Sequence, residues 1–190
     1  MDIVLASQSP RRVQLLGQMG LAFRVHAVDI DEHMDRRLSP GALVEAISRE
    51  KAAACAALEG PAPLIIAADT VVAKGDAVLG KPHSKEDAKE MLRLLSGAEH
   101  QVYTGFTLRQ GGRVESDVVS TAVTFRPLTD AEIDAYIATG EPMDKAGAYG
   151  IQEKGALLVS ALQGDYFNVM GLPVCRLGLM LKRFGVECLA

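Results

Sequence analysis

Leu64-Ile65-Ile66-Ala67-Ala68-Asp69-Thr70-Val71-Val72 is a continuous apolar run that only Asp69 and Thr70 interrupt. A run of this kind is typical of a central strand that is buried on both faces. The apolar residues 2–6 predict a second buried strand. A Ser-Pro pair at residues 9–10 and another at 39–40 each predict a helix start, because serine caps a helix N-terminus and proline suits the first helical position. These two helices are expected to run to about residues 20 and 60.

The rest of the chain continues this alternation of strands and helices. Extended segments at 100–110 and 113–125 are joined by Gly111-Gly112, which predicts a long hairpin, because a two-residue primed turn needs positive φ. The other expected elements are strands over 23–28 and 157–162, helices over 84–97, 129–140 and 173–184, and an irregular Gly-rich stretch over 147–155. This order predicts an α/β fold, in which helices flank a mixed central sheet with an inserted long β-hairpin.

Length and charge limit the classes of protein that fit. The chain has 190 residues, which suits a single domain over 1–190 or two closely packed lobes. Its net charge of −4 argues against a protein that coats nucleic acid, because such a protein needs a basic face to displace counterions from phosphates. A small anionic substrate stays compatible with this charge, since a few clustered Arg and Lys residues can form a local positive pocket.

The spacing of the cysteines and the length of the apolar stretches both predict a cytoplasmic location. Cys55, Cys175 and Cys188 are widely spaced and form no CxxC pair, which predicts reduced thiols with neither a disulfide framework nor a zinc site. Residues 1–12 lack the basic and apolar regions of a signal peptide, and polar residues or glycines break the apolar stretches before membrane-spanning length. We therefore expect a soluble cytoplasmic protein that binds neither nucleic acid nor membrane.

Ser7-Gln8-Ser9-Pro10-Arg11-Arg12 is a candidate anion site. A strand leads here into a helix N-terminus that carries two hydroxyl groups and two guanidinium groups. Free backbone N–H groups and the helix dipole attract anions at such an end, and guanidinium groups match the geometry of phosphate oxygens. A capped surface helix with two solvated arginines is the alternative, and the spacing alone favours it slightly.

Asp69 is a candidate for a catalytic or metal-binding carboxylate. A carboxylate inside an apolar strand costs free energy unless it is paired or binds a metal. The alternative, a strand that simply ends at Asp69, is disfavoured because apolar residues resume at Val71. Asp29, Asp31 and Glu32 form a further carboxylate cluster that suits a divalent cation, with an acidic loop as the common alternative.

Two lysines are weaker candidates for functional residues. Residues 75–82 nearly match the phosphate-binding pattern GxxxxGK[ST], but Pro82 stands where the pattern needs a hydroxyl and offers no backbone N–H. We therefore reject a P-loop, and a kinase with it. Lys81 is then either a phosphate ligand or an exposed lysine at a turn. Lys51 lies on the helix expected after Pro40, where a solvated helix face is the ordinary expectation.

Several short segments along the chain together resemble the Maf family of nucleotide pyrophosphatases. They occur in the family's order and cover nearly the whole chain, and although any one of them is weak evidence, the ordered set is highly specific. One minor departure is alanine at both 67 and 68, where the family more usually has one glycine. The matching segments are LASxSPRR at 5–12, DE at 31–32, REKA at 49–52, ADTVV at 68–72, GKP at 80–82, LSG at 95–97, HQV at 100–102, Thr104, DKAGAYGIQ at 144–152 and VMGLP at 169–173.

The resemblance implies a fold like that of the Maf and ITPase enzymes, with the active site in a cleft. It also implies a homodimer that cuts a nucleoside triphosphate into the monophosphate and pyrophosphate, with Mg²⁺ or Mn²⁺ as cofactor. Asp69 matches the catalytic carboxylate of the family, and Glu32 matches its partner in holding the metal. The positions that match phosphate and substrate ligands are Ser7, Ser9, Arg12, Lys51 and Lys81.

Three further positions concern the choice of base. Arg11, Thr70 and Gln152 match the positions that separate a branch acting on dTTP and UTP from a branch acting on 7-methyl-GTP, which typically has Trp, Gln and Glu there. The resemblance therefore implies dTTP, UTP and modified pyrimidine nucleotides as candidate substrates. Whether Asp69 acts mainly as a base or as a metal ligand stays open. The family has also been linked to cell division and septum formation, so a non-enzymatic regulator is the alternative function.

Overall fold

The computed structural model describes residues 1–30, 34–35 and 37–189, and the chain divides into two units. Unit 1 comprises residues 1–69, 104–119 and 171–190, and unit 2 comprises residues 70–103 and 120–170. The boundaries between the units fall inside three long strands, which are β3 (Leu64–Lys74), β5 (Glu99–Gln110) and β6 (Arg113–Phe125). On β3, Asp69 is the last residue of unit 1 and Thr70 is the first of unit 2.

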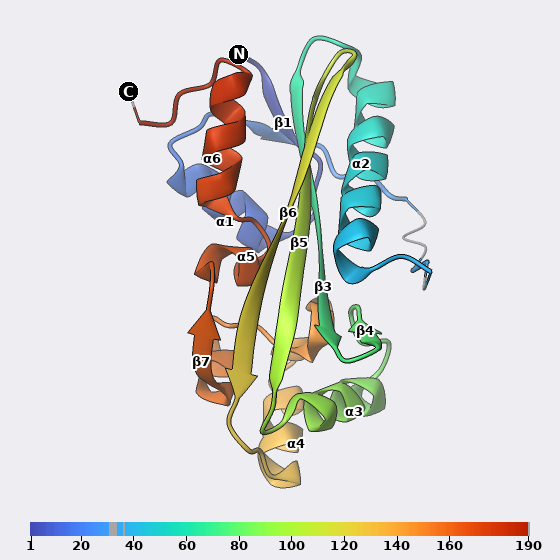
Figure 1. Ribbon diagram of the computed structural model, residues 1–190, viewed down its shortest axis with the longest axis vertical. Coiled ribbons are helices and arrows are strands. Elements are labelled where there is room, and N and C mark those ends of the chain that lie inside the picture. Colours follow the sequence, from blue (N-terminus) through green and yellow to red (C-terminus); the bar gives the residue numbers. More distant parts are fainter. Residues whose placement is uncertain (31–33, 36, 190) are drawn as a thin grey trace. The chain divides into compact units, whose positions relative to one another are not determined.

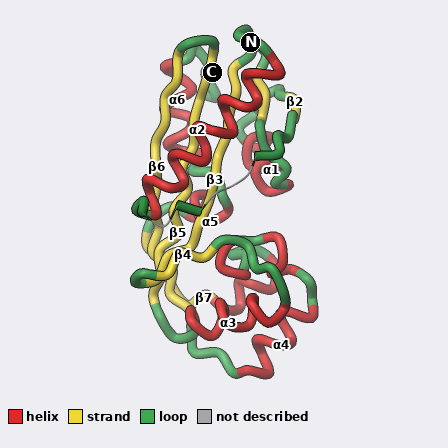
Figure 2. The backbone as a smooth tube through the Cα atoms, turned by 90° about the vertical axis from the view of Figure 1, so that its right-hand side faces the viewer, coloured by secondary structure: helices red, strands yellow, loops and turns green. Residues whose placement is uncertain are grey.

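Unit 1 contains the parallel strands. β1 (Ile3–Leu5) pairs in parallel with β2 (Arg24–Val25) and with β3, so that Leu5 lies opposite Ile66. Within this unit the strand order is β2-β1-β3-β5-β6. In Figures 1 and 2, α2 (Pro40–Glu59) covers one face of these strands, and α1 (Pro10–Gln18) and α6 (Val174–Arg183) lie on the opposite face.

A close backbone contact fixes α2 on the sheet. A Cβ atom built on Gly105 of β5 would lie 2.5 Å from the carbonyl carbon of Val44, so only glycine lets the helix approach the strand this closely. The buried face of α2 includes Val44, Ser48, Lys51 and Cys55, which follow one another at intervals of three and four residues. Lys51 therefore points with this face toward the strands.

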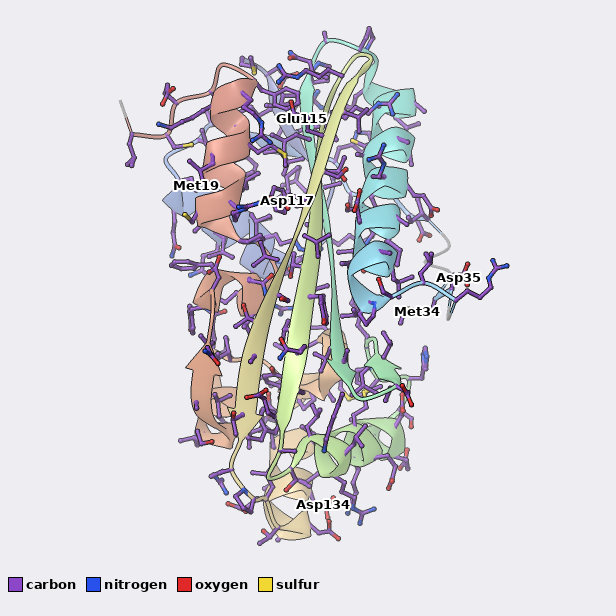
Figure 3. The ribbon with its side chains drawn as sticks, in the orientation of Figure 1. Met19, Met34, Asp35, Glu115, Asp117 and Asp134 are labelled. Carbon is purple, nitrogen blue, oxygen red and sulfur yellow. The ribbon has the colours of Figure 1, made fainter. Side chains whose placement is uncertain are left out.

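Helix α6 is held against β6 by packing and by ion pairs (Figure 3). Glu115 accepts a hydrogen bond from Nε of Arg183 at 2.7 Å, and Asp117 accepts one from Nε of Arg176 at 2.9 Å. Both arginines are more than half exposed, so each pair contributes at most about 1 kcal/mol. Burial of apolar residues of α6, such as Leu177, contributes more than these ion pairs to the stability of the unit.

Unit 2 adds antiparallel strands and several short helices. β4 (Ala77–Leu79) pairs with the end of β3, with Val72 opposite Leu79, and β7 (Val159–Gln163) pairs with β6, with Ala122 opposite Gln163. The α-helices of this unit are α3 (Lys85–Leu95), α4 (Asp130–Ala138) and α5 (Tyr166–Met170). Its 3₁₀ helices are η1 (Glu141–Asp144), η2 (Ala146–Ala148) and η3 (Glu153–Leu158).

The core of unit 2 contains an aromatic cluster with one polar link. The rings of His100, Phe125 and Tyr149 meet edge to face, with centroid distances of 4.6 to 5.4 Å. Nε2 of His100 lies 2.8 Å from the hydroxyl of Tyr149. Burial lowers the pKa of His100 to about 4, so its ring is neutral at physiological pH and packs as part of the core.

The structure confirms most elements expected from the sequence. Ser39 and Ser84 each accept a hydrogen bond from the backbone N–H three residues later, as N-caps do, and the hairpin turn has a φ of 56° at Gly111. Helix α5 was not expected, although Asp165 caps it by accepting from two of its backbone N–H groups. None of the helices in the described part of the chain is long and apolar enough to cross a membrane.

Candidate active site

A buried ion pair joins α2 to β3 in unit 1. Nζ of Lys51 donates a hydrogen bond to Oδ1 of Asp69 at 2.7 Å, and the two side chains are 11% and 10% exposed. The sheet-facing side of α2 positions the lysine, and the apolar strand positions the carboxylate. Two opposite charges that have been removed from water are stable only as a pair, so each side chain fixes the other.

A second cluster lies where β1 leads into α1. Ser9 occupies the N-cap position, but its side chain makes no capping hydrogen bond. Oγ of Ser7 accepts from the Ser9 backbone N–H at 3.1 Å and from Nη1 of Arg12 at 3.4 Å. Nε of Arg12 donates to the carbonyl oxygen of Gly171 at 2.8 Å. An oriented guanidinium group and two hydroxyl groups thus lie at a helix N-terminus, which is an arrangement suited to phosphate.

The solvated-surface alternatives for Arg12 and Lys51 are wrong. Arg12 is 9% exposed and Lys51 is 8% exposed, because both are on helix faces that pack into unit 1. Arg11 is half-buried. The role of Gly171 as an acceptor for Arg12 was missed, since a backbone carbonyl leaves no local signal in a sequence.

Unit 2 holds the remaining candidates. Thr70 is half-buried on the part of β3 that belongs to this unit. Lys81 is exposed after β4, and beside it the N–H of Gly147 donates to the carbonyl oxygen of Gly80 at 3.0 Å. Gln152 is half-buried and occupies the N-cap position of η3. The structure therefore places Lys81 in an exposed irregular segment and leaves its role as a phosphate ligand a prediction.

The predicted metal site is only partly within the described residues. Asp31 and Glu32 lie outside them, so the pairing of Glu32 with Asp69 stays a prediction, and Asp29 is exposed. Among residues 1–30, 34–35 and 37–189, no group of three His, Cys, Asp or Glu side chains is arranged to hold a metal ion. Asp69 fits the role of one oxygen ligand, because the bond from Lys51 uses Oδ1 and a carboxylate offers further lone pairs.

Comparison with known proteins identifies the family of this chain. A family model described as "Maf-like protein" matches residues 2–184. The chain belongs to the Maf family. Because the match covers nearly all of the sequence, the candidate residues at both ends of the chain lie within the family's region.

Relatives with curated names align with this chain over almost their full length. A protein of Moorella thermoacetica named dTTP/UTP pyrophosphatase is 52% identical over 187 residues, which cover 97% of this chain and 96% of the relative. A dTTP/UTP pyrophosphatase of Bacillus pumilus is 47% identical over 185 residues, with 97% of both chains covered. A solved structure of the Staphylococcus aureus Ham1 protein covers 66% of this chain and 72% of its own, with 15% identity and a TM-score of 0.48, which is too weak a likeness to support the assignment.

We predict that Lys51 and Asp69 are strongly coupled in stability. Lys51→Met should lower the free energy of unfolding by about 3–5 kcal/mol, because it leaves a buried carboxylate without its counter-charge. The double variant Lys51→Met/Asp69→Asn should be more stable than Lys51→Met alone, because it removes that uncompensated charge. Chemical denaturation of the four proteins measures the coupling.

Lys182→Met is the matched control for this cycle. Lys182 also belongs to unit 1, but it is 51% exposed and lies 3.3 Å from an exposed Glu187, so its loss should cost less than about 1 kcal/mol. A double variant that is less stable than Lys51→Met would contradict the coupling.

Proposed function

We propose that this chain is a nucleoside triphosphate pyrophosphatase that converts dTTP and UTP into the monophosphate and pyrophosphate. The observation that carries the proposal is the buried Lys51–Asp69 pair in a member of the Maf family. Relatives named dTTP/UTP pyrophosphatase, 44–52% identical over nearly the whole chain, support the same activity. A purely regulatory protein would not require Asp69, Lys81 and Glu32 together with the arginines.

The basic and hydroxyl side chains are proposed to bind the triphosphate. Hydrolysis between the α and β phosphates requires that dispersed negative charge be neutralised and that a water molecule be aimed at phosphorus. Arg12 has a fixed orientation because it donates to Gly171 and Ser7, so it loses little side-chain freedom when it binds an anion. The proposed ligands of phosphate and substrate are Ser7, Ser9, Arg12, Lys51 and Lys81.

Asp69 is proposed to take the proton from the attacking water, to hold a divalent cation together with Glu32, or to do both. Its burial beside Lys51 keeps the carboxylate in one position, which is what a general base or a metal ligand needs. A bound Mg²⁺ or Mn²⁺ ion would supply a water molecule of lowered pKa and would neutralise phosphate charge. Lys51 holds Oδ1 of the carboxylate in place.

Arg11, Thr70 and Gln152 are proposed to select the base. The amide of Gln152 carries both a donor and an acceptor, so it can pair with the O4 and N3–H edge of uracil or thymine. A site built on such hydrogen bonds rejects other bases, because mismatched buried polar groups are left unpaired. A homodimeric state and a cytoplasmic location stay predictions, as does the use of modified pyrimidine nucleotides.

The proposed reaction predicts pyrophosphate, and not orthophosphate, as the first inorganic product from UTP. Turnover should need a divalent cation and should stop in excess chelator, because carboxylates repel the triphosphate unless a cation neutralises the charge between them. Chromatography of the nucleotide product together with a coupled pyrophosphate assay measures both. Formation of UDP and orthophosphate as primary products, or full rates in chelator, would rule the proposal out.

The proposed base selection predicts a ranking of substrates. UTP and dTTP should have the highest kcat/KM, and CTP, GTP and 7-methyl-GTP should rank below them. Gln152→Glu should lower kcat/KM for UTP about 10- to 100-fold, because the carboxylate loses the amide donor, a loss of about 1–3 kcal/mol. Gln163→Glu, an exposed position on β7, is the matched control and should change nothing.

Two outcomes of this comparison count against the dTTP/UTP branch. One is a wild-type protein that prefers 7-methyl-GTP. The other is a Gln152→Glu protein with an unchanged order of substrates.

A further inference from the structure

Glu141 of η1 gathers three hydrogen bonds from unit 2. Its Oε1 accepts from the hydroxyl of Tyr136 at 2.9 Å and from the backbone N–H of Gly155 at 3.0 Å. Its Oε2 accepts from the backbone N–H of Lys154 at 3.2 Å. Two of these donors belong to residues 150–155, which we call the Gln152 loop. One carboxylate thus binds the end of the loop that carries the proposed base-reading side chain.

The N-cap side chain of η3 would normally accept hydrogen bonds from the two backbone N–H groups that Glu141 binds. Gln152 occupies the N-cap position of η3, and the N–H groups of Lys154 and Gly155 belong to the first turn of that helix. The first N–H groups of a helix have no partner within it, and an N-cap side chain usually accepts from the second or third of them. The side chain of Gln152 makes no such bond, and Glu141 supplies the acceptor instead. The amide of Gln152 is therefore not used to cap its own helix.

The other end of the loop is fastened to the same network. The N–H of Gly150 donates to the hydroxyl of Tyr136 at 3.1 Å, and this hydroxyl in turn donates to Glu141. The two ends of the loop also touch, since a Cβ atom built on Gly155 would lie 1.9 Å from the carbonyl oxygen of Gly150. The Gln152 loop is thus closed at its base by Tyr136 and Glu141, with no room for a side chain at Gly155.

The backbone next to Gln152 is strained. Glu153 has a φ of 53°, a left-handed conformation that costs a non-glycine residue about 1–3 kcal/mol. Such a conformation persists only where the surroundings hold it. The adjacent N–H groups of Lys154 and Gly155, bound by Glu141, provide that restraint.

We propose that Glu141, acting with Tyr136, is a positioning residue for base selection, which holds the Gln152 loop so that the amide of Gln152 presents its donor and acceptor to the nucleobase. The inference rests on the proposed function and deepens it. Glu141 does not touch the substrate in this account. It acts by accepting the hydrogen bonds of the first turn of η3, so that the Gln152 side chain does not cap the helix and can bind the nucleobase.

The first test measures the loop without any substrate. In Glu141→Gln, the side-chain amide keeps a single acceptor oxygen for three donors, so the amide protons of Lys154 and Gly155 should exchange with solvent at least about tenfold faster by NMR. Glu132→Gln is the matched control, because Glu132 lies in the same unit and its carboxylate also accepts three hydrogen bonds, from Thr129 and Arg126, neither of which belongs to the Gln152 loop. The control should lower the stability of unit 2 without changing exchange at Lys154 and Gly155 relative to the rest of the unit.

The second test measures selection. In Glu141→Gln the ratio of kcat/KM for UTP to that for CTP should fall about tenfold, mainly through a higher KM for UTP, while kcat for UTP changes less than about threefold. Tyr136→Phe should move the ratio in the same direction, and Glu132→Gln should leave it unchanged. Unchanged exchange at the two amides, or an unchanged ratio in Glu141→Gln, would overturn the inference. A wild-type protein without a preference for UTP would instead overturn the proposed function, and the exchange result would not depend on it.

Discussion

The buried pair of Lys51 and Asp69 is the constraint on which the candidate site depends. A carboxylate within a buried apolar strand would destabilise the fold if it stood alone, and so would a lysine on the packed face of α2. Their contact at 2.7 Å resolves both problems and fixes one carboxylate oxygen in space. The pair requires that α2 lie directly on the strands, which the absence of a side chain at Gly105 permits. The packing of α2 on the strands, the charge balance of the buried residues and the proposed role of Asp69 therefore all depend on the contact between Lys51 and Asp69.

The residues proposed for phosphate chemistry and those proposed for base selection lie mainly in different units. Unit 1 carries the ion pair and the oriented guanidinium group of Arg12, which suit phosphate charge and proton transfer. Unit 2 carries Gln152 on a loop whose backbone is held from η1 and α4 by Glu141 and Tyr136. In this account, rate depends mainly on the first unit, and the choice of base depends mainly on the second. The boundary on β3, between Asp69 and Thr70, falls between a proposed catalytic residue and a proposed specificity residue.

Local signals in the sequence predict much of this structure, and long-range contacts account for what they miss. The caps at Ser39 and Ser84 and the Gly111-Gly112 turn are local, and the structure confirms them. The local sequence around Lys51 predicts a solvated lysine. Its burial depends on how closely α2 approaches a strand that is far away in the sequence, which local patterns do not show. The carbonyl oxygen of Gly171 and the carboxylate of Glu141 bind partners 159 and 14 residues away, and no periodicity or spacing marks such acceptors.

Asp69 is proposed to serve catalysis and not only the ion pair. The most direct test is the rate of pyrophosphate release from UTP by Asp69→Asn, measured beside its midpoint of chemical denaturation. Asparagine keeps the shape of the side chain and an acceptor for Lys51 but removes the counter-charge, so the protein should still fold with a lower midpoint of denaturation. The rate of the folded protein should fall by ~10²–10⁴-fold, because an amide can neither take a proton nor bind a metal ion as a carboxylate does. A folded Asp69→Asn protein with a near-normal rate would show that the carboxylate serves only the ion pair.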